Sequence, residues 1–307
     1  MAIRIGIVGV GKIARDQHLP VLQGGSEFEL VAAASRNAVV EGLPSYASLP
    51  EMLSAHPDLE AITLSTPPQG RHELASQALA AGKHVMLEKP PGATLSEVED
   101  LRGMAERAGR TLFATWHSRF APCVEAARAW LAERRITTVR VDWREDVRRW
   151  HPGQAWIWEP GGLGVFDPGI NALSIVTRIL PRPFFLTEGV LRFPSNRQAP
   201  VAADLVFRDA TGVRIEAGFD WLQTGAQTWD VRVETDAGVL VLSKGGSRME
   251  VDGELRCEEP EAEYAGLYRR FARLVREGRS DVDISPLRHV ADAFLSGRRE
   301  TVEPFVE

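Results

Sequence analysis

The chain has 307 residues, two cysteines and a formal net charge of −6 at neutral pH. This length exceeds what one hydrophobic core usually supports, so we expect two domains. The acidic balance gives no basic footprint for nucleic acid, and no apolar run is long enough to span a bilayer. Met1 leads directly into an apolar segment without the charged and apolar regions of a signal peptide, so we expect a soluble, cytoplasmic protein.

The two cysteines, Cys123 and Cys257, are too few for a disulfide framework and lack metal-ligand spacing. We therefore expect both to be reduced thiols. His117, Glu145 and His151 are residue types that bind zinc, but no closely spaced ligand motif accompanies them. We expect no metal ion.

The N-terminal part of the chain alternates between strand and helix patterns. Strands are expected at residues 3–8, 28–34, 61–65, 85–87 and 112–115, and helices at 12–22, 71–81 and 96–108. Ser96 and Glu99 have the spacing of a capping box at the last of these helices. This alternation is typical of a parallel sheet with right-handed crossovers.

From residue 136 the pattern changes to period-two strands separated by turn signals. Strands are expected at residues 138–145, 185–193, 202–207, 213–221, 229–235 and 239–243, and helices at 122–134, 263–277 and 286–296. These elements predict an α/β protein whose second part is an α+β domain with an open, mostly antiparallel sheet. An open sheet face needs cover, so we expect a homo-oligomer that forms through the C-terminal sheet.

A glycine-rich turn, Gly9-Val10-Gly11, joins the first strand to the first helix. Glycine at position 9 permits a tight turn, and glycine at 11 lets backbone N–H groups approach a pyrophosphate at the positive end of the helix. Such turns also serve as plain connectors, but the strand before and the helix after favour dinucleotide binding. The expected cofactor-binding residues are Gly9, Gly11, Lys12, Ile13, Ser35, Arg36, Thr66, Pro67, Glu88 and Lys89.

The second strand ends in Ser35-Arg36, where a dinucleotide-binding domain reads the adenosine ribose. An acidic residue here would bind the ribose 2′-OH and repel a 2′-phosphate, whereas a hydroxyl and a guanidinium suit the phosphate. We therefore expect NADP as the preferred cofactor, with NAD as the alternative. An ordinary solvated arginine at a strand end is the other interpretation of Arg36.

Three motifs together resemble those of the glucose–fructose oxidoreductase/inositol dehydrogenase (Gfo/Idh/MocA) family. They are the glycine turn with Ile13-Ala14, the segment 81–90 (AGKHVMLEKP) and the segment 161–167 (GGLGVFD). The resemblance covers essentially the whole chain, and it extends to bacterial L-arabinose/D-galactose 1-dehydrogenases in the segments 115–119, 143–154 and 167–171. It implies oxidation of the C1 hydroxyl of either sugar to the lactone, with hydride transfer to NAD(P). We expect a dinucleotide-binding Rossmann domain at residues 1–118 and a substrate-binding and oligomerisation domain at 119–307.

Lys89, Asp167 and Asn171 are the expected catalytic residues. Lys89 follows a parallel strand, at the edge where open α/β sheets bind ligands, and its ammonium can stabilise negative charge on a reacting oxygen. Asp167 and Asn171 share one face of a helix if a helix begins after Gly164. Many family members have histidine where this chain has Asn171, and asparagine accepts no proton. The base is therefore Asp167, which we prefer, or neutral Lys89, and Asp167 as a plain helix cap is the alternative.

A sugar site needs flat apolar surfaces for C–H bonds and polar groups for hydroxyls. The expected substrate-binding residues are His117, Glu145, Arg149, Trp150, His151, Asp167, Asn171 and Trp229. Trp156 and Trp158 are further candidates for stacking, although tryptophan often has a purely structural role. Two alternatives stay open: a family enzyme that acts on another polyol or sugar, and a non-catalytic NADP-binding regulatory protein.

Overall fold

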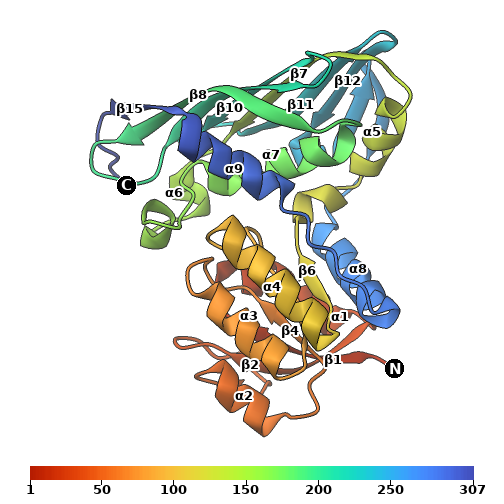
Figure 1. Cartoon of the computed structure of the whole chain (residues 1–307), viewed down its shortest axis with the longest axis vertical. Helices are drawn as coiled ribbons and strands as arrows, with labels where there is room; N and C mark the ends of the chain where they lie inside the picture. The colour runs from red at the N-terminus through yellow and green to blue at the C-terminus, as the bar shows by residue number, and fades with distance from the viewer. The chain divides into compact units, whose positions relative to one another are not determined.

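The computed structural model describes all 307 residues, which divide into two compact units (Figure 1). The first unit contains residues 1–117 and 264–284, and the second contains residues 118–263 and 285–307. The expected boundary after residue 118 placed α8 (Glu263–Glu277) in the second domain, but nearly all of this helix belongs to the first unit. Aromatic packing explains the difference, because the rings of Tyr268 and Phe271 each lie 5.5 Å from that of Phe28.

The first unit is built on a six-stranded sheet with strand order β3-β2-β1-β4-β5-β6. Its strands are β1 (Ile3–Val8), β2 (Phe28–Ala34), β3 (Ser45–Tyr46), β4 (Ala61–Leu64), β5 (His84–Leu87) and β6 (Leu112–Ala114). Every neighbouring pair is parallel, which confirms the predicted parallel sheet. The strand order reverses at β1, and open α/β sheets bind ligands beyond the carboxyl ends of the strands at such a point.

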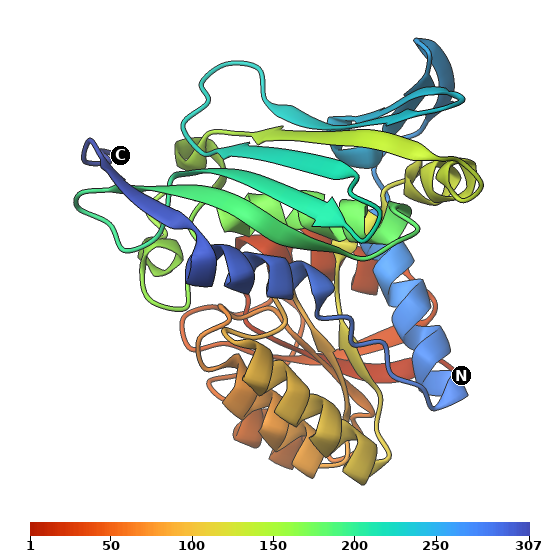
Figure 2. The ribbon, with the colours of Figure 1, turned by 45° about the horizontal axis from the view of Figure 1, so that its top comes forward.

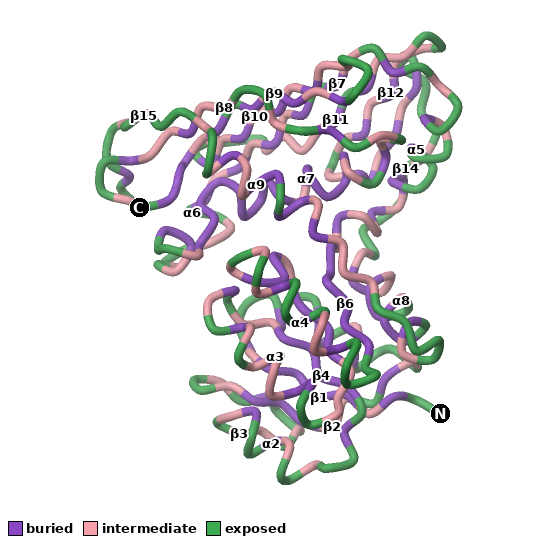
Figure 3. Tube along the Cα trace, in the orientation of Figure 1, coloured by how far each residue is buried: buried purple, intermediate pink, exposed green.

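Helices connect these strands, and β4 between them is buried at every residue (Figure 3). The helices are α1 (Leu19–Gly24), preceded without interruption by a π-helical turn (Ala14–His18), then α2 (Leu49–Ala55), α3 (Arg71–Ala80) and α4 (Leu95–Ala108). The predicted capping box at Ser96 and Glu99 is wrong. The box is formed by Thr94 and Glu97, because Thr94 has the extended backbone of an N-cap and its hydroxyl accepts a hydrogen bond from the Glu97 N–H.

The second unit contains a nine-stranded sheet with order β14-β13-β12-β11-β7-β10-β9-β8-β15. Its strands are β7 (Ile136–Arg144), β8 (Phe184–Pro194), β9 (Ala202–Asp209), β10 (Arg214–Asp220), β11 (Thr228–Thr235), β12 (Gly238–Ser243), β13 (Arg248–Val251), β14 (Glu254–Glu258) and β15 (Arg298–Val302). The pairs β7–β10 and β8–β15 are parallel and the others are antiparallel, so the predicted mostly antiparallel sheet is confirmed. The last three strands were not predicted, and β14 and β15 consist mostly of polar residues that are exposed.

Helices α7 (Phe166–Ile179) and α9 (Ser285–Ser296) cover one face of this sheet, and α5 (Val124–Leu131) packs beside α7 (Figure 2). In β10 the buried residues Ile215 and Phe219 face these helices, and a Cβ on Gly169 of α7 would lie 3.0 Å from the Phe219 ring. The other face carries charged side chains in ion pairs such as Arg140–Asp142. None of the helices combines the length and the hydropathy that a membrane-spanning segment needs.

A disulfide joins Cys123, at the start of α5, to Cys257 in β14, with 5.9 Å between their Cα atoms. The prediction of two reduced thiols is therefore wrong. The hairpin of β13 and β14 brings Cys257 to α5, and that hairpin is an element which the sequence pattern did not predict. Cysteine number and spacing carry no information about such a long-range approach, since the two residues are 134 positions apart.

Candidate active site

The glycine turn after β1 has the geometry that an anionic group needs. Gly9 has φ +90°, and a Cβ there would lie 2.9 Å from the backbone nitrogen of Thr66. Gly11 is exposed, and a Cβ on it would meet nothing within 4 Å. The helix begins directly afterwards, since the Arg15 N–H donates to the Gly11 carbonyl at 3.1 Å. Its first N–H groups have no partner within the helix, so the turn fits a pyrophosphate.

The other expected cofactor-binding residues follow the carboxyl ends of adjacent strands of the same sheet. Ser35 and Arg36 follow β2, Lys12 and Ile13 open the helix after β1, Thr66 and Pro67 follow β4, and Glu88 and Lys89 follow β5. Ile13 is 37% exposed and presents an apolar surface beside the glycine turn. Arg36 is exposed and forms no ion pair with any carboxylate of the chain. These residues therefore fit a dinucleotide laid along one sheet edge.

Arg71 connects two of these turns, and no sequence pattern predicts this role. It is the first residue of α3, where arginine is commonly solvated, but it is 2% exposed. Its guanidinium donates to the carbonyl oxygens of Thr66, Glu88 and Pro90. The Lys89–Pro90 peptide between the last two is cis. Arg71 thus holds the turn after β4 and the turn after β5 together from inside the unit.

Glu88 is buried at the end of β5, with a relative exposure of 3%. Its Oε1 accepts a hydrogen bond of 2.6 Å from the Tyr264 hydroxyl and lies 3.3 Å from His18 Nε2, and its Oε2 accepts the Lys89 N–H. Burial acts to raise the pKa of this carboxyl, but the close contact with His18, the charges of His18 and His117 and the hydrogen bond from Tyr264 outweigh it and lower the pKa to about 2. His117, expected to bind substrate, stacks on Tyr264 with 5.4 Å between ring centroids.

In the second unit, a buried carboxylate follows β7. Glu145 Oε1 accepts from Trp221 Nε1 at 3.2 Å, and Oε2 accepts from Trp229 Nε1 at 3.0 Å. Burial raises the pKa of Glu145, and the charge of nearby Asp167 adds to the rise, against the effects of the two indoles and of His151. Trp229 was expected as a stacking surface, and its indole N–H also fixes this carboxylate.

Asp167 lies in the first turn of α7 and is 2% exposed. Its Oδ2 is 3.2 Å from His151 Nε2, while His151 Nδ1 lies 3.3 Å from Gln154 Oε1. The ring of His151 also packs against Trp221 at 5.4 Å. Asn171 is half-buried one turn further along α7, as its spacing from Asp167 predicts.

The glycines before α7 are needed to bring the preceding loop against this helix. A Cβ on Gly162 would lie 2.2 Å from the Trp156 carbonyl oxygen. Gly164 has φ +54°, and a Cβ there would lie 2.3 Å from the Pro200 carbonyl oxygen. Residues with a side chain would push the segment away at both positions, so these glycines set where Asp167 begins the helix.

Aromatic side chains line the same part of the second unit. The Arg149 guanidinium lies 5.0 Å from the Trp150 ring, and Trp150 lies 5.8 Å from Trp229. Trp158 packs against Trp221 and Phe305 and is 9% exposed, which indicates a structural role. The expected residues that gather in this polar and aromatic cluster are Glu145, Arg149, Trp150, His151, Asp167 and Trp229.

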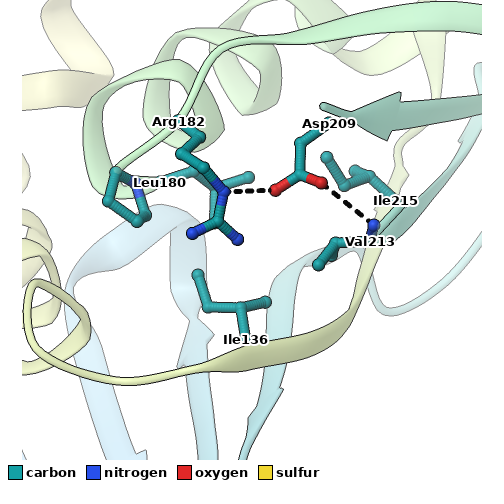
Figure 4. Close-up of a pocket in the computed structure, with 7 residues that line it drawn as sticks. Ile136, Leu180, Arg182, Asp209, Val213 and Ile215 are labelled. Atoms are coloured by element: carbon teal, nitrogen blue, oxygen red, sulfur yellow. Dashed lines mark hydrogen bonds and ion pairs between the residues drawn. The ribbon is translucent and has the colours of Figure 1, made fainter. Parts of the chain in front are cut away.

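A small hollow lies elsewhere in the second unit (Figure 4). Ile136, at the start of β7, and Val213, before β10, line it, and Arg182 and Asp209 close it with an ion pair of 2.7 Å. Glu145 and Trp221 follow the other ends of these two parallel strands, and at about 3.3 Å per residue those ends lie roughly 25 to 30 Å away. The hollow is therefore distinct from the polar and aromatic cluster. No three His, Cys, Asp or Glu side chains gather in a way that would hold a metal ion.

Comparison with known proteins agrees with this geometry. Residues 3–115 match the oxidoreductase family with an NAD-binding Rossmann fold. The chain is 47% identical over 307 residues to galactose 1-dehydrogenase from Pseudomonas fluorescens, covering 99% of each chain. The crystal structure of D-galactose-1-dehydrogenase from Rhizobium etli is similar with a TM-score of 0.96 and 60% identity, covering 99% of this chain and 98% of that one. KijD10, a 3-ketoreductase from Actinomadura kijaniata in complex with NADP and TDP-benzene, shares the fold, with a TM-score of 0.86 at 21% identity over 98% of this chain and 100% of that one. The chain therefore belongs to the Gfo/Idh/MocA family of oxidoreductases.

Proposed function

We propose that this oxidoreductase is an aldose 1-dehydrogenase that oxidises the C1 hydroxyl of D-galactose and L-arabinose to the sugar lactone. The observation that supports it most is the cluster in which Glu145, His151 and Asp167 lie among indole rings. Carboxylates and imidazole bind sugar hydroxyls, and indole faces pack against sugar C–H bonds. The galactose 1-dehydrogenases that resemble this chain over almost its full length support the same substrate class.

A nicotinamide cofactor supplies the hydride acceptor when it is bound. Gly11, Lys12 and Ile13 would hold its pyrophosphate, and the turns fixed by Arg71 would lie along its nicotinamide half. We propose NADP as the preferred cofactor, because Arg36 is an exposed guanidinium with no carboxylate partner at the end of β2. NAD remains the alternative cofactor.

The chemistry of C1 oxidation requires a proton acceptor and a group that stabilises the developing alkoxide. We assign the second role to the Lys89 ammonium and the first to Asp167. His151 Nε2 lies 3.2 Å from Asp167 Oδ2 and orients this carboxylate. Asn171 has no basic atom, so it orients the sugar or the nicotinamide by hydrogen bonds.

Sugar recognition is assigned to His117, Glu145, Arg149, Trp150, His151 and Trp229, together with Asp167 and Asn171. Glu145 is held by two indole N–H groups and is preoriented as a hydrogen-bond partner of a sugar hydroxyl. D-Galactose and L-arabinose share the configuration from C1 to C4 and differ in the C5 hydroxymethyl group. D-Glucose has the inverted C4 hydroxyl, which would leave a buried polar partner unpaired.

We also propose a homo-oligomer that covers the open face of the nine-stranded sheet. Charges of both signs alternate along this face in pairs such as Arg140–Asp142, Arg214–Glu216 and Arg232–Glu234. A twofold axis brings the same surface of two copies together, so a face with charges of both signs can pair with itself. Light scattering at several protein concentrations would measure the molar mass and show whether the protein forms an oligomer.

A sugar panel tests the proposed activity. The protein is mixed with NADP⁺ or NAD⁺ and each sugar, and absorbance of the reduced nicotinamide is followed. D-Galactose and L-arabinose should give turnover with kcat/KM at least about 100-fold above that of D-glucose. Equal rates on glucose and galactose would contradict the assignment of the C4 hydroxyl. Turnover only on another polyol would make this a different dehydrogenase of the family, and nucleotide binding without any turnover would favour a regulatory protein.

A further inference from the structure

We propose that His18 is a positioning residue for Lys89, acting through the carboxylate of Glu88. The proposal rests on the dehydrogenase function above, in which Lys89 meets the reacting oxygen. His18 does not touch substrate or cofactor in this scheme. It fixes the segment of backbone that carries the lysine.

His18 is the last residue of the π-helical turn Ala14–His18, in the helix that follows the glycine turn. Its side chain is fully buried, which is unusual for histidine unless its ring nitrogens have partners. Nδ1 lies 2.8 Å from the hydroxyl of Tyr268, and Nε2 lies 3.3 Å from Glu88 Oε1, which is long for a hydrogen bond. A π-helical turn is rare and often marks a functional site, and here it carries the imidazole that reaches Glu88.

The roles of the two ring nitrogens follow from their partners. Glu88 is ionised, with a pKa of about 2, so its oxygens accept hydrogen bonds only. Nε2 faces this carboxylate at 3.3 Å without the geometry of a hydrogen bond, and Nδ1 makes a hydrogen-bond contact with the Tyr268 hydroxyl. The contacts of Tyr268 with His18 and of His18 with Glu88 thus form a buried chain, and the Tyr264 hydroxyl donates a hydrogen bond to Glu88 at 2.6 Å.

The contacts of Glu88 also restrain the backbone of Lys89. One carboxylate oxygen is held by Tyr264 and approached by His18, and the other accepts the N–H of Lys89 itself. Arg71 holds the neighbouring carbonyls of Glu88 and Pro90. The backbone on both sides of Lys89 is therefore restrained by charged side chains. Because a displacement of about 1 Å in an active site can cost about 100-fold in rate, loss of one restraint should appear in turnover.

Two substitutions of His18 separate positioning from simple filling of space. Glutamine places an N–H close to the position of Nε2, whereas asparagine reaches only the position of Nδ1. His18→Asn should lower kcat about 10- to 100-fold with a nucleotide dissociation constant within about threefold of wild type, and His18→Gln should retain most of the wild-type kcat. His56→Asn is the matched control, since His56 also contacts a tyrosine hydroxyl, that of Tyr46 at 3.0 Å, and should leave kcat unchanged.

In a second pair of variants, each substitution removes one tyrosine hydroxyl and leaves the rest of the side chain unchanged. Tyr264→Phe removes the hydrogen bond to Glu88, and Tyr46→Phe removes the corresponding bond in the control pair. Tyr264→Phe should lower kcat about 3- to 10-fold, and Tyr46→Phe should not change it. This pair decides the question if His18→Asn does not fold.

The chemical reactivity of Lys89 tests its positioning without any measurement of turnover. Acetylation by acetic anhydride is followed at Lys89 by peptide mass spectrometry, with Lys83 as the internal reference, because Lys83 is held by the carbonyls of Pro57 and Leu59. His18→Asn should raise the rate at Lys89 relative to Lys83 by roughly twofold or more, and His56→Asn should not. Equal losses of kcat and of melting temperature in His18→Asn and His18→Gln would overturn the proposal, as would unchanged Lys89 reactivity. A wild-type enzyme without sugar turnover would refute the proposed function alone, and the acetylation ratio would still test the positioning.

Discussion

Two buried glutamates, one in each unit, have similar positions and opposite electrostatics. Glu88 follows β5 and Glu145 follows β7, and each accepts hydrogen bonds from aromatic side chains on other elements. The pKa of Glu88 is lowered to about 2, despite burial that acts to raise it, because two imidazoles lie close to the carboxylate and the Tyr264 hydroxyl donates to it. Burial raises the pKa of Glu145, since its donors are neutral indoles and Asp167 adds a negative charge nearby.

The comparison teaches that the partners of a buried carboxyl, and not burial alone, decide its charge. In the first unit a carboxylate that is ionised at neutral pH accepts the backbone N–H of Lys89 and restrains it. In the second unit the carboxyl of Glu145 accepts from two neutral indoles, and burial favours its protonated form.

The largest effects are expected at the residues assigned to the chemistry. Lys89→Ala and Asp167→Asn should each lower kcat about 10²- to 10⁴-fold, the usual range for loss of electrostatic or acid–base assistance. Nucleotide binding, followed by quenching of tryptophan fluorescence, should stay near normal in both. Asp167→Asn should also flatten the acidic limb of the pH–rate profile, because the group that must be deprotonated is gone.

Surface residues provide the matched controls for this pair. Lys83→Ala and Asp204→Asn remove the same charges in the same two units, where Lys83 binds backbone carbonyls and Asp204 pairs with Arg192 on the sheet face. Both should keep the wild-type kcat. If Asp167→Asn kept wild-type turnover and the same acidic limb, the base would instead be neutral Lys89 or a water held by Glu145 or His151.

The sequence predicts the two units unequally well, and the reason is physical. The parallel sheet, the glycine turn and the turn after β5 follow from local patterns, because each strand is a short apolar run and each turn carries its own glycine or proline. The position of α8 does not follow, since its assignment to the first unit depends on packing of Tyr268 and Phe271 against Phe28. Residues that act through long-range contacts, such as His18 and Arg71, look like ordinary helix residues in the sequence.

The second unit shows the same limit at its edge strands and its site. Asp167 and Asn171 are predicted from their spacing on one helix, and the structure places them there. The contact of His151 with Asp167 joins two elements whose approach depends on close packing at Gly162 and Gly164, which no local pattern encodes. The disulfide was missed for the same reason, because it depends on the unpredicted hairpin of β13 and β14.

Reduction of the disulfide should destabilise the second unit and leave the first unit unaffected, since both cysteines belong to the second. A crosslink that closes a loop of this length contributes up to about 5 kcal/mol by restricting the unfolded chain. Cys123→Ser with Cys257→Ser should therefore lower the urea midpoint of the second unit, followed by hydrogen exchange of β7 and β11. As a control, the two cysteines of the folded wild-type protein are treated with an alkylating reagent in the absence of reductant. Rapid labelling of both would show that the disulfide is absent in solution.

Acid titration should separate the two glutamates by the sign of their effect on stability. The folded pKa of Glu88, about 2, lies below the reference value of 4.5, so its contribution is present above pH 4.5 and is lost as the pH falls towards 2. Glu88→Gln should thus cost about 3 kcal/mol near neutral pH and much less at pH 3. The raised pKa of Glu145 gives the opposite sign, because its contribution is present below pH 4.5 and is lost as the pH rises through its folded pKa. Glu145→Gln should therefore be neutral or stabilising at pH 7, measured by urea unfolding, and a loss of stability equal to that of Glu88→Gln would contradict the difference between the two sites.

The smallest expected effect concerns the cofactor and should be confined to the first unit. Arg36 is exposed at the end of β2, so its interaction with a 2′-phosphate is partly screened by water and salt. Arg36→Ala should raise the Michaelis constant for NADP about 10- to 100-fold and leave that for NAD and for the sugar nearly unchanged, because only the 2′-phosphate needs the charge. Ser35→Asp should shift preference further towards NAD by repulsion of the same phosphate. Asn37→Ala, at the neighbouring position, leaves the Arg36 guanidinium and the Ser35 hydroxyl in place and serves as the control. An equal change for NADP and NAD in Arg36→Ala would mean that the guanidinium stacks on the adenine, and an altered sugar Michaelis constant would mean that the nucleotide and sugar regions are coupled through this strand end.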